Sequence, residues 1–320
     1  MRRRCLRFES DTLRRFPRRR RYLIGVSGGR DSVALLHWLV DLGYRKLIVC
    51  HLDHQLRGRF SQADTRFVGK LAAKYDVDFE LESANVPALA KKRKMSIEAA
   101  AREARYSFFA KVAKRQPCGT IFLAHHADDL VETFLINLFR GAGLTGLAAM
   151  RETSLRRIDD IDLTIVRPLL GVWRNEIEKY VRKHRLKFRE DASNKNLTPL
   201  RNRVRQRIIP YIEKQLGRKI RMSVWRAARI AADEESWIDA QLRVSLSRNG
   251  HLNVRELRAL PIALQRRTIL KWLRTQNLSE IGFEAIERVR SLIDPAARVA
   301  KVNLAHNQHV RRRAGEIFIE

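Results

Sequence analysis

Cysteine is scarce in this chain, and the few cysteines are scattered. The 320 residues include three of them, Cys5, Cys50 and Cys118, with no C-x-x-C pair. This usage is typical of reduced thiols in a cytoplasmic protein, and it argues against a disulfide framework and against a cysteine-built metal site. We therefore expect a cytoplasmic localisation.

Long apolar runs are also missing. No stretch of the sequence is long enough to cross a bilayer and no isolated amphipathic anchor is visible, so we expect no membrane partner. The arginine-rich start runs directly into the first predicted strand, whose apolar run is too short for the hydrophobic region of a signal peptide. We expect no secretory leader.

Acidic residues are few beside the basic ones. The chain holds 65 lysines and arginines against 35 aspartates and glutamates, a formal net charge of +30. An excess of this size repels itself in the compact state and indicates a polyanionic partner that neutralises it. A solvated surface with a high arginine content is the alternative interpretation. We favour nucleic acid as the partner.

Arginine is concentrated at the start of the chain. Residues 1–21 contain ten arginines beside Glu9 and Asp11. Like-charge blocks of this kind usually fray, and they often contact nucleic acid. We expect a basic N-terminal segment over residues 1–21 that carries no chemistry.

One stretch combines a strand, a glycine turn and a helix. Residues 22–43 read YLIGVSGGRDSVALLHWLVDLG, which predicts a buried strand over 22–26, a tight turn over 27–30 and a helix after it. The apolar residues of that helix recur at helical spacing and are Val33, Leu36, Leu39 and Val40. The glycine spacing is neither that of the Walker A motif nor that of the dinucleotide fingerprint.

The turn has the residues of a pyrophosphate cradle. Gly28 and Gly29 lack Cβ atoms and allow positive φ, so successive N–H groups can converge on an anion, and the helix N-terminus adds partial positive charge. Ser27 and Ser32 contribute hydroxyl donors, and Asp31 puts a carboxylate where a Mg²⁺ accompanying a polyphosphate would lie. Tight packing of the strand on the helix is the alternative interpretation of the two glycines.

Strands and helices alternate from residue 21 to about residue 164. Strands are predicted over 22–26, 46–52, 78–83 and 120–124, and helices over 61–75, 96–115 and 128–140. This alternation predicts an α/β fold with a doubly wound, mostly parallel sheet. Ligands of such sheets bind beyond the C-terminal ends of the strands. Three polar segments each follow a strand, and they are 27–32, 51–57 and 125–132.

The second polar segment belongs to HLDHQLRG, residues 51–58. It contains His51, Asp53, His54 and Arg57. Two histidines three residues apart are compatible with a metal site, but no further histidine or cysteine has matching spacing. We expect these side chains to line the nucleotide pocket or to cap the loop.

The third polar segment opens LAHHADDLVETFLINLFRGAGLTGL, residues 123–147. Asp129 and Glu132 are three residues apart on a helix, so their carboxylates share one face, beside His125 and His126 at the strand end. Acidic residues in a first helical turn also complement the helix dipole. Near a phosphate cradle, however, an acid cluster serves as a Mg²⁺ anchor or as a socket for an ammonium group.

Several arginines accompany these loops. Arg105 lies off the apolar stripe of the helix at 96–115, and spacing alone makes it a solvated surface residue. The polar segment at 188–205 ends in a basic patch suited to phosphates. The arginines of that patch are Arg201, Arg203 and Arg205.

The remaining segments change character twice. Residues 151–163 are polar and predict a surface excursion, and an extended segment over 165–170 and a helix over 173–185 follow. From about Gly217 helices dominate, and they are predicted over 219–245, 254–257, 262–275 and 283–292. The last residues, 298–320, alternate apolar and polar side chains around turn residues, which predicts a β-hairpin.

Assembled in order, these motifs resemble those of the tRNA(Ile)-lysidine synthetase family, which is part of the PP-loop ATP pyrophosphatase superfamily. The resemblance covers roughly residues 21–212, and the helical tail and hairpin are similar in layout to the family's shorter members. The motifs are SGGRDS at 27–32, HLDHQLRG at 51–58, EAAAREARYSFF at 98–109, HHADDLVET at 125–133 with FRGAGLTGL behind it, RPLL at 167–170, EDASN at 190–194 and RNRVR at 201–205.

The resemblance implies a domain layout and a reaction. After the basic segment 1–21, a PP-loop ATP-binding catalytic domain is expected over 22–216 and a helical tRNA-binding domain that ends in a hairpin over 217–320. The family's partners are ATP with Mg²⁺, free L-lysine and a tRNA(Ile) with a CAU anticodon. ATP adenylates the C2 oxygen of the wobble cytidine with release of pyrophosphate, and the lysine ε-amine then displaces AMP to give lysidine.

The resemblance also implies roles for individual residues. Asp129 and Glu132 match an acidic pair that binds lysine and assists metal or proton transfer, and Asp31 lies near Mg²⁺. His125 and Arg105 match positions at the reactive centre, where a cation stabilises charge developing on the α-phosphate. ATP is held by Ser27, Gly28, Gly29, Arg30, Asp31 and Ser32, and the tRNA backbone and nucleotide lie near Arg201, Arg203 and Arg205.

Two positions depart from the family's pattern. Arg30 fills a slot that is often apolar or Lys, and Asp53 stands where Asn is frequent.

Three rival functions have to be weighed. A sulfur-inserting PP-loop enzyme commonly needs paired cysteines, which this chain lacks. A small-molecule PP-loop ligase would not need the positive charge, and a non-catalytic RNA-binding protein would not need the intact cradle and acids. The oligomeric state stays open, with a homodimer as one alternative.

Overall fold

The computed structural model describes residues 8, 10–55, 59–148, 150–189, 199–242, 250–276, 278, 281–294, 300–304 and 308–320, without the side chains of residues 59–61. The chain forms two compact units. The first comprises Met1–Ile136 and Met150–Arg226, and the second comprises Asn137–Ala149 and Ala227–Glu320. The second unit thus takes in a short segment from the middle of the chain. The domain boundaries expected at residues 22 and 217 stay predictions.

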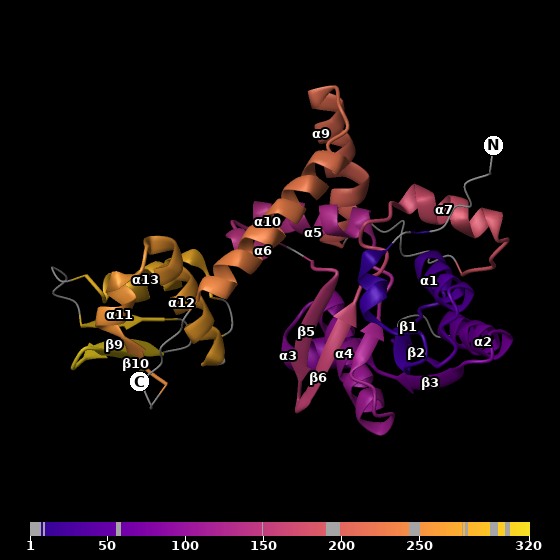
Figure 1. Ribbon diagram of the computed structural model, residues 1–320, viewed down its shortest axis with the longest axis horizontal. Coiled ribbons are helices and arrows are strands. Elements are labelled where there is room, and N and C mark those ends of the chain that lie inside the picture. The colour runs from indigo at the N-terminus through magenta and orange to yellow at the C-terminus, as the bar shows by residue number, and fades with distance from the viewer. Residues whose placement is uncertain are drawn as a thin grey trace. The chain divides into compact units, whose positions relative to one another are not determined.

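A six-stranded sheet organises the first unit, and its order is β3-β2-β1-β4-β6-β5. All neighbouring strands pair in parallel except β5, which runs antiparallel to β6 (Figure 1). The mostly parallel α/β sheet predicted from the alternation is therefore confirmed. The strands are β1 (Tyr22–Gly25), β2 (Leu47–Asp53), β3 (Asp78–Ser83), β4 (Thr120–Phe122), β5 (Thr153–Ile158) and β6 (Ile161–Val166).

The sheet is buried on both faces, because alternate strand residues point to opposite sides. Ile24 and Phe122 face one apolar cluster, which α1 (Arg30–Asp41), α2 (Arg59–Lys74) and α7 (Arg174–Lys183) complete. Leu23 and Ile121 face a second cluster, which α4 (Ile97–Arg115) completes. Each fully buried side chain of this size stabilises the fold by about 1.5–3 kcal/mol relative to exposure.

The helix α3 (Val86–Arg93) and the β5–β6 hairpin of the first unit were not anticipated. The helix lies between β3 and α4, and Asn85 caps its N-terminus by accepting a hydrogen bond from the N–H of Ala88. The expected surface excursion at 151–163 is wrong, since β5 and β6 form a hairpin there. As an edge strand β5 has one solvated side, where Leu155 is 70% exposed, so its polar composition fits a strand.

The described part of the N-terminal segment is ordered, which corrects the expectation that it frays. Asp11–Arg15 forms a 3₁₀ turn, and Leu13 is buried in the core of the first unit. Phe8 packs edge-on against Trp38, with 5.2 Å between ring centroids. The apolar residues between the arginines provide the anchoring that a count of charges overlooks.

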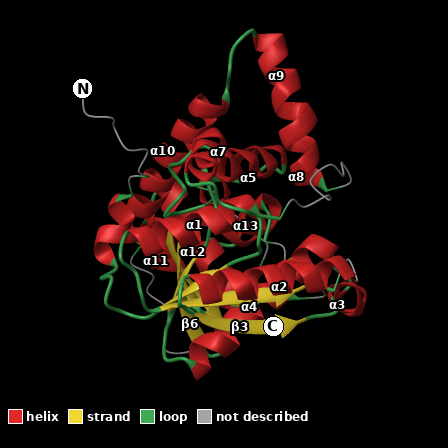
Figure 2. Ribbon diagram, turned by 90° about the vertical axis from the view of Figure 1, so that its right-hand side faces the viewer, coloured by secondary structure: helices red, strands yellow, loops and turns green. Residues whose placement is uncertain are grey.

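The last part of the first unit is helical. It contains α8 (Leu200–Arg203), a π-helical turn at Val204–Ile208, α9 (Ile209–Leu216) and the start of α10 (Arg221–Gln241). Gly217 ends α9 with φ of +61°, the left-handed conformation typical of a helix C-terminus. In both views α9 extends away from the strands of its unit (Figures 1 and 2).

The second unit combines helices with a small antiparallel sheet of order β7-β10-β9-β8. Strands β9 and β10 form the predicted terminal hairpin, which is confirmed. Buried Trp272 and Ile317 lie in the apolar core of the second unit, and a buried Arg267–Glu235 ion pair lies outside that core. The elements are α6 (Leu144–Leu147), β7 (Leu252–Asn253), α11 (Val254–Ala259), α12 (Ile262–Thr275), α13 (Phe283–Ser291), β8 (Lys301–Asn303), β9 (His309–Arg313) and β10 (Glu316–Ile319).

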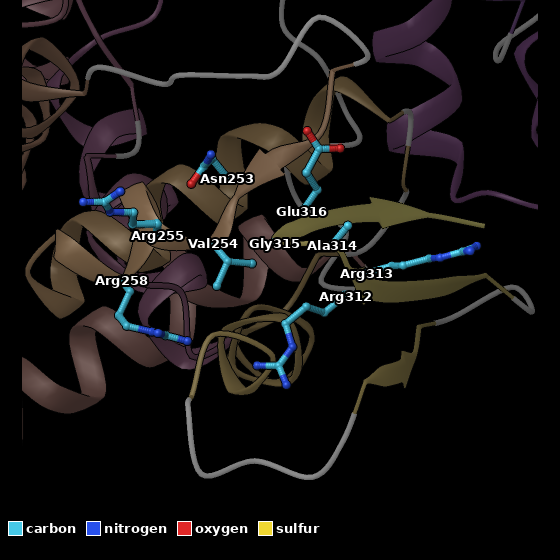
Figure 3. Close-up of a pocket in the computed structure, with 9 residues that line it drawn as sticks. All are labelled: Asn253, Val254, Arg255, Arg258, Arg312, Arg313, Ala314, Gly315 and Glu316. Atoms are coloured by element: carbon cyan, nitrogen blue, oxygen red, sulfur yellow. The ribbon is translucent and has the colours of Figure 1, made fainter.

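A cavity of about 540 Å³ lies at the β9–β10 turn of the second unit (Figure 3). Two of its arginines have structural partners: Arg258 donates to the carbonyl of Ile293, and Arg312 donates to those of Leu292 and Asp294. These contacts satisfy carbonyl groups at the C-terminal end of α13. Among the residues that the structure describes, no helix is both long and apolar enough to span a bilayer.

Candidate active site

The glycine turn between β1 and α1 forms a backbone concavity at the C-terminal end of β1. Gly28 has φ of +87°, and a Cβ atom there would lie 3.3 Å from the side chain of Val68, so only glycine fits without strain. Gly29 is the N-cap residue of α1 and has no side chain that could accept from the first N–H groups of the helix. Since the first N–H groups of a helix have no acceptor within it, those of α1 are directed at the turn, where an anion can accept them.

Hydroxyl groups hold the turn in shape. Ser27 Oγ lies 3.3 Å from Ser32 Oγ and accepts a 3.3 Å hydrogen bond from the N–H of Gly29. Ser32 Oγ in turn donates to the carbonyl of Gly29 at 2.9 Å. The N–H of Arg189 donates to the carbonyl of Gly28 at 2.9 Å and ties the segment after α7 to the turn. The concavity is therefore preorganised.

A cavity of about 390 Å³ opens beside this turn, within the size range of small-molecule sites. Strands β1, β2 and β4 all end at it, so side chains from the three polar segments that follow these strands meet there, together with residues of α4. The lining residues are Gly25, Val26, Ser27, Gly29, Asp31, Ser32, Cys50, His51, Leu52, Asp53, His54, Asp64, Arg105, Phe109, Leu123, Ala124 and His125.

One wall of the cavity is made by His51 of β2, by His54 directly after that strand and by an arginine of α4. His51 is buried, and its Nδ1 lies 2.8 Å from the carbonyl oxygen of Val26. Arg105 Nη2 lies 3.5 Å from His54 Nε2. Burial and then the charge of Arg105 lower the pKa of His54 to about 4, so this imidazole is neutral and accepts from the guanidinium. Arg105 is thus a half-buried cation that lines the cavity, whereas spacing alone made it a solvated residue.

His125 lies at the end of β4 and also lines the cavity. Burial and the charges of Arg167, Arg201 and Arg105 lower its pKa to about 3, although Asp129 opposes them. Its Nδ1 is buried without a hydrogen-bond partner among the described residues. His125 is therefore a neutral hydrogen-bonding group here, while Arg105 is the cation.

The neighbouring His126 joins the glycine turn to the acidic helix α5 (Ala127–Phe139). Its Nε2 lies 3.6 Å from Asp31 Oδ2 and 3.6 Å from Asp129 Oδ2, and its Nδ1 lies 3.8 Å from Asp128 Oδ2. Burial would lower the pKa of His126, but these three carboxylates raise it above its ordinary value. The buried imidazole of His126 therefore lies between the carboxylates of the turn and of α5, and they favour its charged form.

Two arginines from the helical segment after residue 199 pair with the acidic face of α5. Arg205 Nε and Nη2 lie 2.5 and 2.9 Å from the two oxygens of Glu132, and Nη2 lies 3.5 Å from Asp129 Oδ1. Arg201 donates to Thr133 Oγ1 at 2.6 Å and lies 3.6 Å from Glu132. Arg203 is exposed and does not take part, so the structure divides the predicted arginine patch.

The two carboxylates of this face have pKa values that move in opposite directions. Burial would raise the pKa of Asp129, but His126, His125 and Arg201 lower it below its ordinary value. Burial raises the pKa of Glu132 and the charge of Asp129 adds to the effect, against the pull of Arg205. Such a divergence is typical of a site where one carboxylate stays charged and its neighbour accepts a proton.

Arg30, which was expected to hold ATP, and two arginines that the sequence did not single out surround the site. Arg30 uses its side chain outside the turn, where it pairs with Glu178 at 2.6 Å and with Asp31 at 3.1 Å. Arg174 begins α7, and its N–H donates to Asp128 at 3.0 Å, while Arg221 donates to the same carboxylate at 2.6 Å. Arg174 lies four residues after the end of RPLL at 167–170, and its spacing alone gave no signal of a role in the site.

The donor set fits a magnesium ion only if phosphate supplies most of the ligands. In the described ranges no group of three or more histidine, cysteine, aspartate or glutamate side chains could hold a metal by itself. Mg²⁺ commonly uses one or two carboxylates together with phosphate oxygens and waters. Asp31 meets that need: burial would raise its pKa, but His126 and Arg30 lower it to about 2, so the carboxylate is charged.

Comparison with protein families finds two matches. Residues 3–212 match the PP-loop domain, and residues 252–318 match the TilS substrate binding domain. The tRNA(Ile)-lysidine synthase of Geobacter sulfurreducens is 37% identical over 312 residues, which are 93% of this chain and 64% of that protein. The one of Chlorobaculum tepidum is 34% identical over 285 residues, 86% of this chain and 83% of that protein. The chain thus spans less than two thirds of the length of the Geobacter relative.

Among solved structures, the fold is similar to that of the U34-tRNA thiolase NcsA from Methanococcus maripaludis with its [4Fe-4S] cluster. The TM-score is 0.54 at 15% sequence identity, over 75% of this chain and 77% of that one. At this identity the likeness concerns the fold alone. It agrees with the mostly parallel sheet described above.

Proposed function

This chain belongs to the tRNA(Ile)-lysidine synthase family, and from that premise we propose that it ligates lysine to the wobble cytidine of a tRNA(Ile) with a CAU anticodon. The bond forms between the lysine ε-nitrogen and C2 of the base, and ATP is converted to AMP and pyrophosphate. The reaction takes place in the cytoplasm. A homodimer stays a prediction, which light scattering in solution would test.

In the first step the glycine turn holds ATP. The backbone N–H groups at Gly28, Gly29 and the start of α1 hold the β- and γ-phosphates, with the hydroxyls of Ser27 and Ser32 beside them. Asp31 would hold a Mg²⁺ bound to these phosphates. The C2 oxygen of cytidine attacks the α-phosphorus, so the bond to pyrophosphate breaks as the bond to the base oxygen forms. When bound there, the metal would supply positive charge to the leaving pyrophosphate.

The base reaches this position because an anticodon nucleotide is single-stranded and can be turned out of its stack. The cavity beside the turn receives it. Arg105 stabilises the charge that develops on the α-phosphate, and neutral His125 contributes a hydrogen bond to the same centre. Holding three reactants in one geometry is the main contribution of the site to the rate.

In the second step Asp129 and Glu132 bind the lysine ammonium group in place of the guanidinium of Arg205. The amine attacks C2 after losing a proton, and Glu132 accepts that proton because its pKa is raised. AMP leaves with the electron pair of the C2–oxygen bond. Arg205, once displaced from Glu132, and Arg201 are free to pair with phosphate groups, and exposed Arg203 contacts the tRNA backbone.

The single observation that carries this proposal is the position of His126. A nucleotide cradle and an acidic face on different elements could lie far apart, but here one imidazole is within 3.6 Å of a carboxylate from each. A phosphate bound at the turn and an ammonium bound at α5 would therefore be neighbours. A decayed nucleotide site in a mere RNA-binding protein has no need of this geometry.

The decisive experiment is incubation with radiolabelled lysine, ATP and a CAU-bearing tRNA(Ile), followed by nucleoside analysis. We expect one labelled nucleoside, dependent on ATP, and no label when the wobble cytidine is replaced by uridine. ATP–pyrophosphate exchange stimulated by tRNA separates an enzyme from a non-catalytic RNA binder. Sulfur insertion is disfavoured, because the three cysteines of the sequence include no C-x-x-C pair that would serve a sulfur relay or an iron–sulfur cluster.

A further inference from the structure

A strongly basic surface lies away from the site. It is formed by residues 10–21 together with Arg45 and Lys46, and we call it the N-terminal collar. Its basic side chains are all exposed and are Arg14, Arg15, Arg18, Arg19, Arg20, Arg21, Arg45 and Lys46. The carboxylates that lie within it or line its hollow are Asp11, Asp76 and Asp78.

The backbone of the collar is held in place, because apolar contacts and hydrogen bonds fix the segment that carries the arginines. Leu13 is buried in the core, and Phe16 packs edge-on against Phe122 with 5.9 Å between centroids. Tyr44 Oη donates to the carbonyls of Phe16 at 2.8 Å and Leu13 at 3.3 Å, and Tyr22 Oη donates to that of Pro17 at 3.0 Å. The guanidinium groups are therefore held outward by a fixed chain.

The collar also encloses a hollow of about 400 Å³. Four of the collar's basic residues line it, namely Arg19, Arg21, Arg45 and Lys46, and so do Asp76 and Asp78. Within the described residues the collar's charges have few partners. Arg14 forms an exposed ion pair with Asp11 at 3.3 Å, and Arg21 donates to Gln116 at 2.9 Å. Since exposed pairs contribute little, the surface keeps a large excess of positive charge.

The hollow of the collar lies at the opposite edge of the sheet from the active site, whereas Thr12, in the first part of the collar, donates to Glu152 beside the last residues of β6. The hollow adjoins the first residues of β1 and β2, whereas the glycine turn and the cavity follow their last residues. The seven residues of β2, at about 3.3 Å each, separate the two edges by about 20 Å.

We propose that the N-terminal collar binds the phosphodiester backbone of the tRNA substrate outside its anticodon loop. The argument is charge complementarity: arginines held on a rigid surface in a chain of net charge +30 match the regular phosphates of an RNA stem. An anticodon loop in the cavity cannot at the same time lie at the other edge of the sheet. The proposal rests on the proposed function only in taking tRNA as the RNA.

The test compares two triple variants with equal loss of charge. In R18Q/R19Q/R20Q the collar loses three arginines, and in K91Q/K92Q/K94Q the exposed basic cluster at α3 loses three lysines. The dissociation constant for tRNA(Ile) is measured by filter binding over a range of salt concentrations. Each phosphate contact contributes about 0.9 to the slope of log K against log salt, so the collar variant's slope should fall by about 2.7.

Both proteins lose affinity for tRNA when the salt concentration rises from about 50 to about 200 mM. The factor of this loss should be about 40-fold smaller for the collar variant than for the wild type. The α3 variant should keep the wild-type slope. A second series with the isolated anticodon stem-loop locates the contact. A change shared by the stem-loop assigns it to the anticodon stem, and a change confined to tRNA assigns it to the remaining stems. An unchanged slope in the collar variant, or equal changes in both variants, overturns the proposal.

Lysine incorporation keeps the two proposals apart. The collar variant should retain the wild-type kcat at saturating tRNA and show a raised KM for tRNA only. If the wild type incorporates no lysine, the proposed function fails, while the binding series still decides the collar. If the wild type is active and the collar variant has an unchanged KM and slope, only the collar proposal fails.

Discussion

Replacing His126 by glutamine tests the feature on which the geometry of the site depends. His126 is 2% exposed and lies within 4 Å of Asp31, Asp128 and Asp129. Glutamine keeps most of the volume and the hydrogen-bonding capacity but removes the positive charge. We expect H126Q to be less stable than the wild type at neutral pH, because the three carboxylates lose their shared cation.

The size of the effect follows from Asp31. Its pKa is lowered from 3.8 to about 2, against the effect of burial, and His126 is the largest cause of the lowering. At about 1.36 kcal/mol per pKa unit, this shift corresponds to about 2.4 kcal/mol of stability near neutral pH. Arg30 accounts for part of it, while Asp128 and Asp129 add contributions of their own. We therefore expect H126Q to lower the free energy of unfolding by about 2 kcal/mol near pH 6.

The pH dependence gives the prediction its sign. The pKa of His126 is raised in the folded protein, since the carboxylates outweigh burial. Its stabilising contribution is therefore complete below the unfolded value of about 6.5 and is lost as the pH rises through the folded value. The difference between wild type and H126Q should shrink at alkaline pH. On the acid side, the contribution of Asp31 is present above about 3.8 and is lost as the pH falls through about 2.

The assay is urea unfolding followed by circular dichroism at acidic, neutral and alkaline pH. The matched control is H37Q on α1, in the same unit, where Nδ1 of His37 lies 2.7 Å from Tyr180 Oη. Burial and then His184 lower the pKa of His37, so its contribution is present above about 6.5 and is lost as the pH falls. The penalty of H37Q should therefore grow toward alkaline pH. A penalty of H126Q that is constant with pH would refute the imidazolium assignment.

Three substitutions address the chemistry directly. D31A should abolish ATP–pyrophosphate exchange and leave the dissociation constant for tRNA unchanged, and normal turnover by this variant would contradict the role of Asp31. E132Q should lower kcat/KM for lysine by about 100-fold or more, with a much smaller effect on the KM for ATP; equal effects on both substrates would remove Glu132 from proton transfer. R174A should raise the KM for ATP about tenfold, because the Arg174 guanidinium lies near Arg30 and Asp31 and a charged hydrogen bond contributes about 1.5–3 kcal/mol. The control is R182A, at an exposed position of the same helix, which should leave the KM for ATP unchanged.

The sequence contained the layout of the first unit because its signals are local. Strand and helix periodicity, together with the glycine turn, predicted the parallel sheet and the edge at which ligands bind. What periodicity could not supply was the pairing of charges across elements. His126, for example, is only one residue from His125, yet it faces carboxylates of two different segments, whereas His125 faces the cavity. Neighbours at the end of a strand point to opposite sides, and tertiary packing decides which side is chemically useful.

The N-terminal segment shows how composition can mislead. Ten arginines in 21 residues predict repulsion, but Leu13 and Phe16 between them bury enough apolar surface to fix the chain. Self-repulsion among exposed guanidinium groups is weakened by solvent and salt, while an apolar side chain gains about 1.5–3 kcal/mol on burial. A few apolar residues are therefore sufficient to order a strongly charged segment when the core offers a place for them.

The sequence also did not show that Arg203 points away from the site to which Arg201 and Arg205 belong. The sequence interprets residues 188–205 as a polar segment, but a helical run extends from Leu200 to Leu216. Pro210 argues against a continuous α-helix over this run, since proline lacks an N–H and its ring collides with the carbonyl four residues earlier. The π-helical turn at Val204–Ile208 comes directly before that proline and loosens the backbone where the collision would occur. On a helix, Arg201 and Arg205 lie four residues apart on the face toward Glu132, and Arg203 between them must point to solvent.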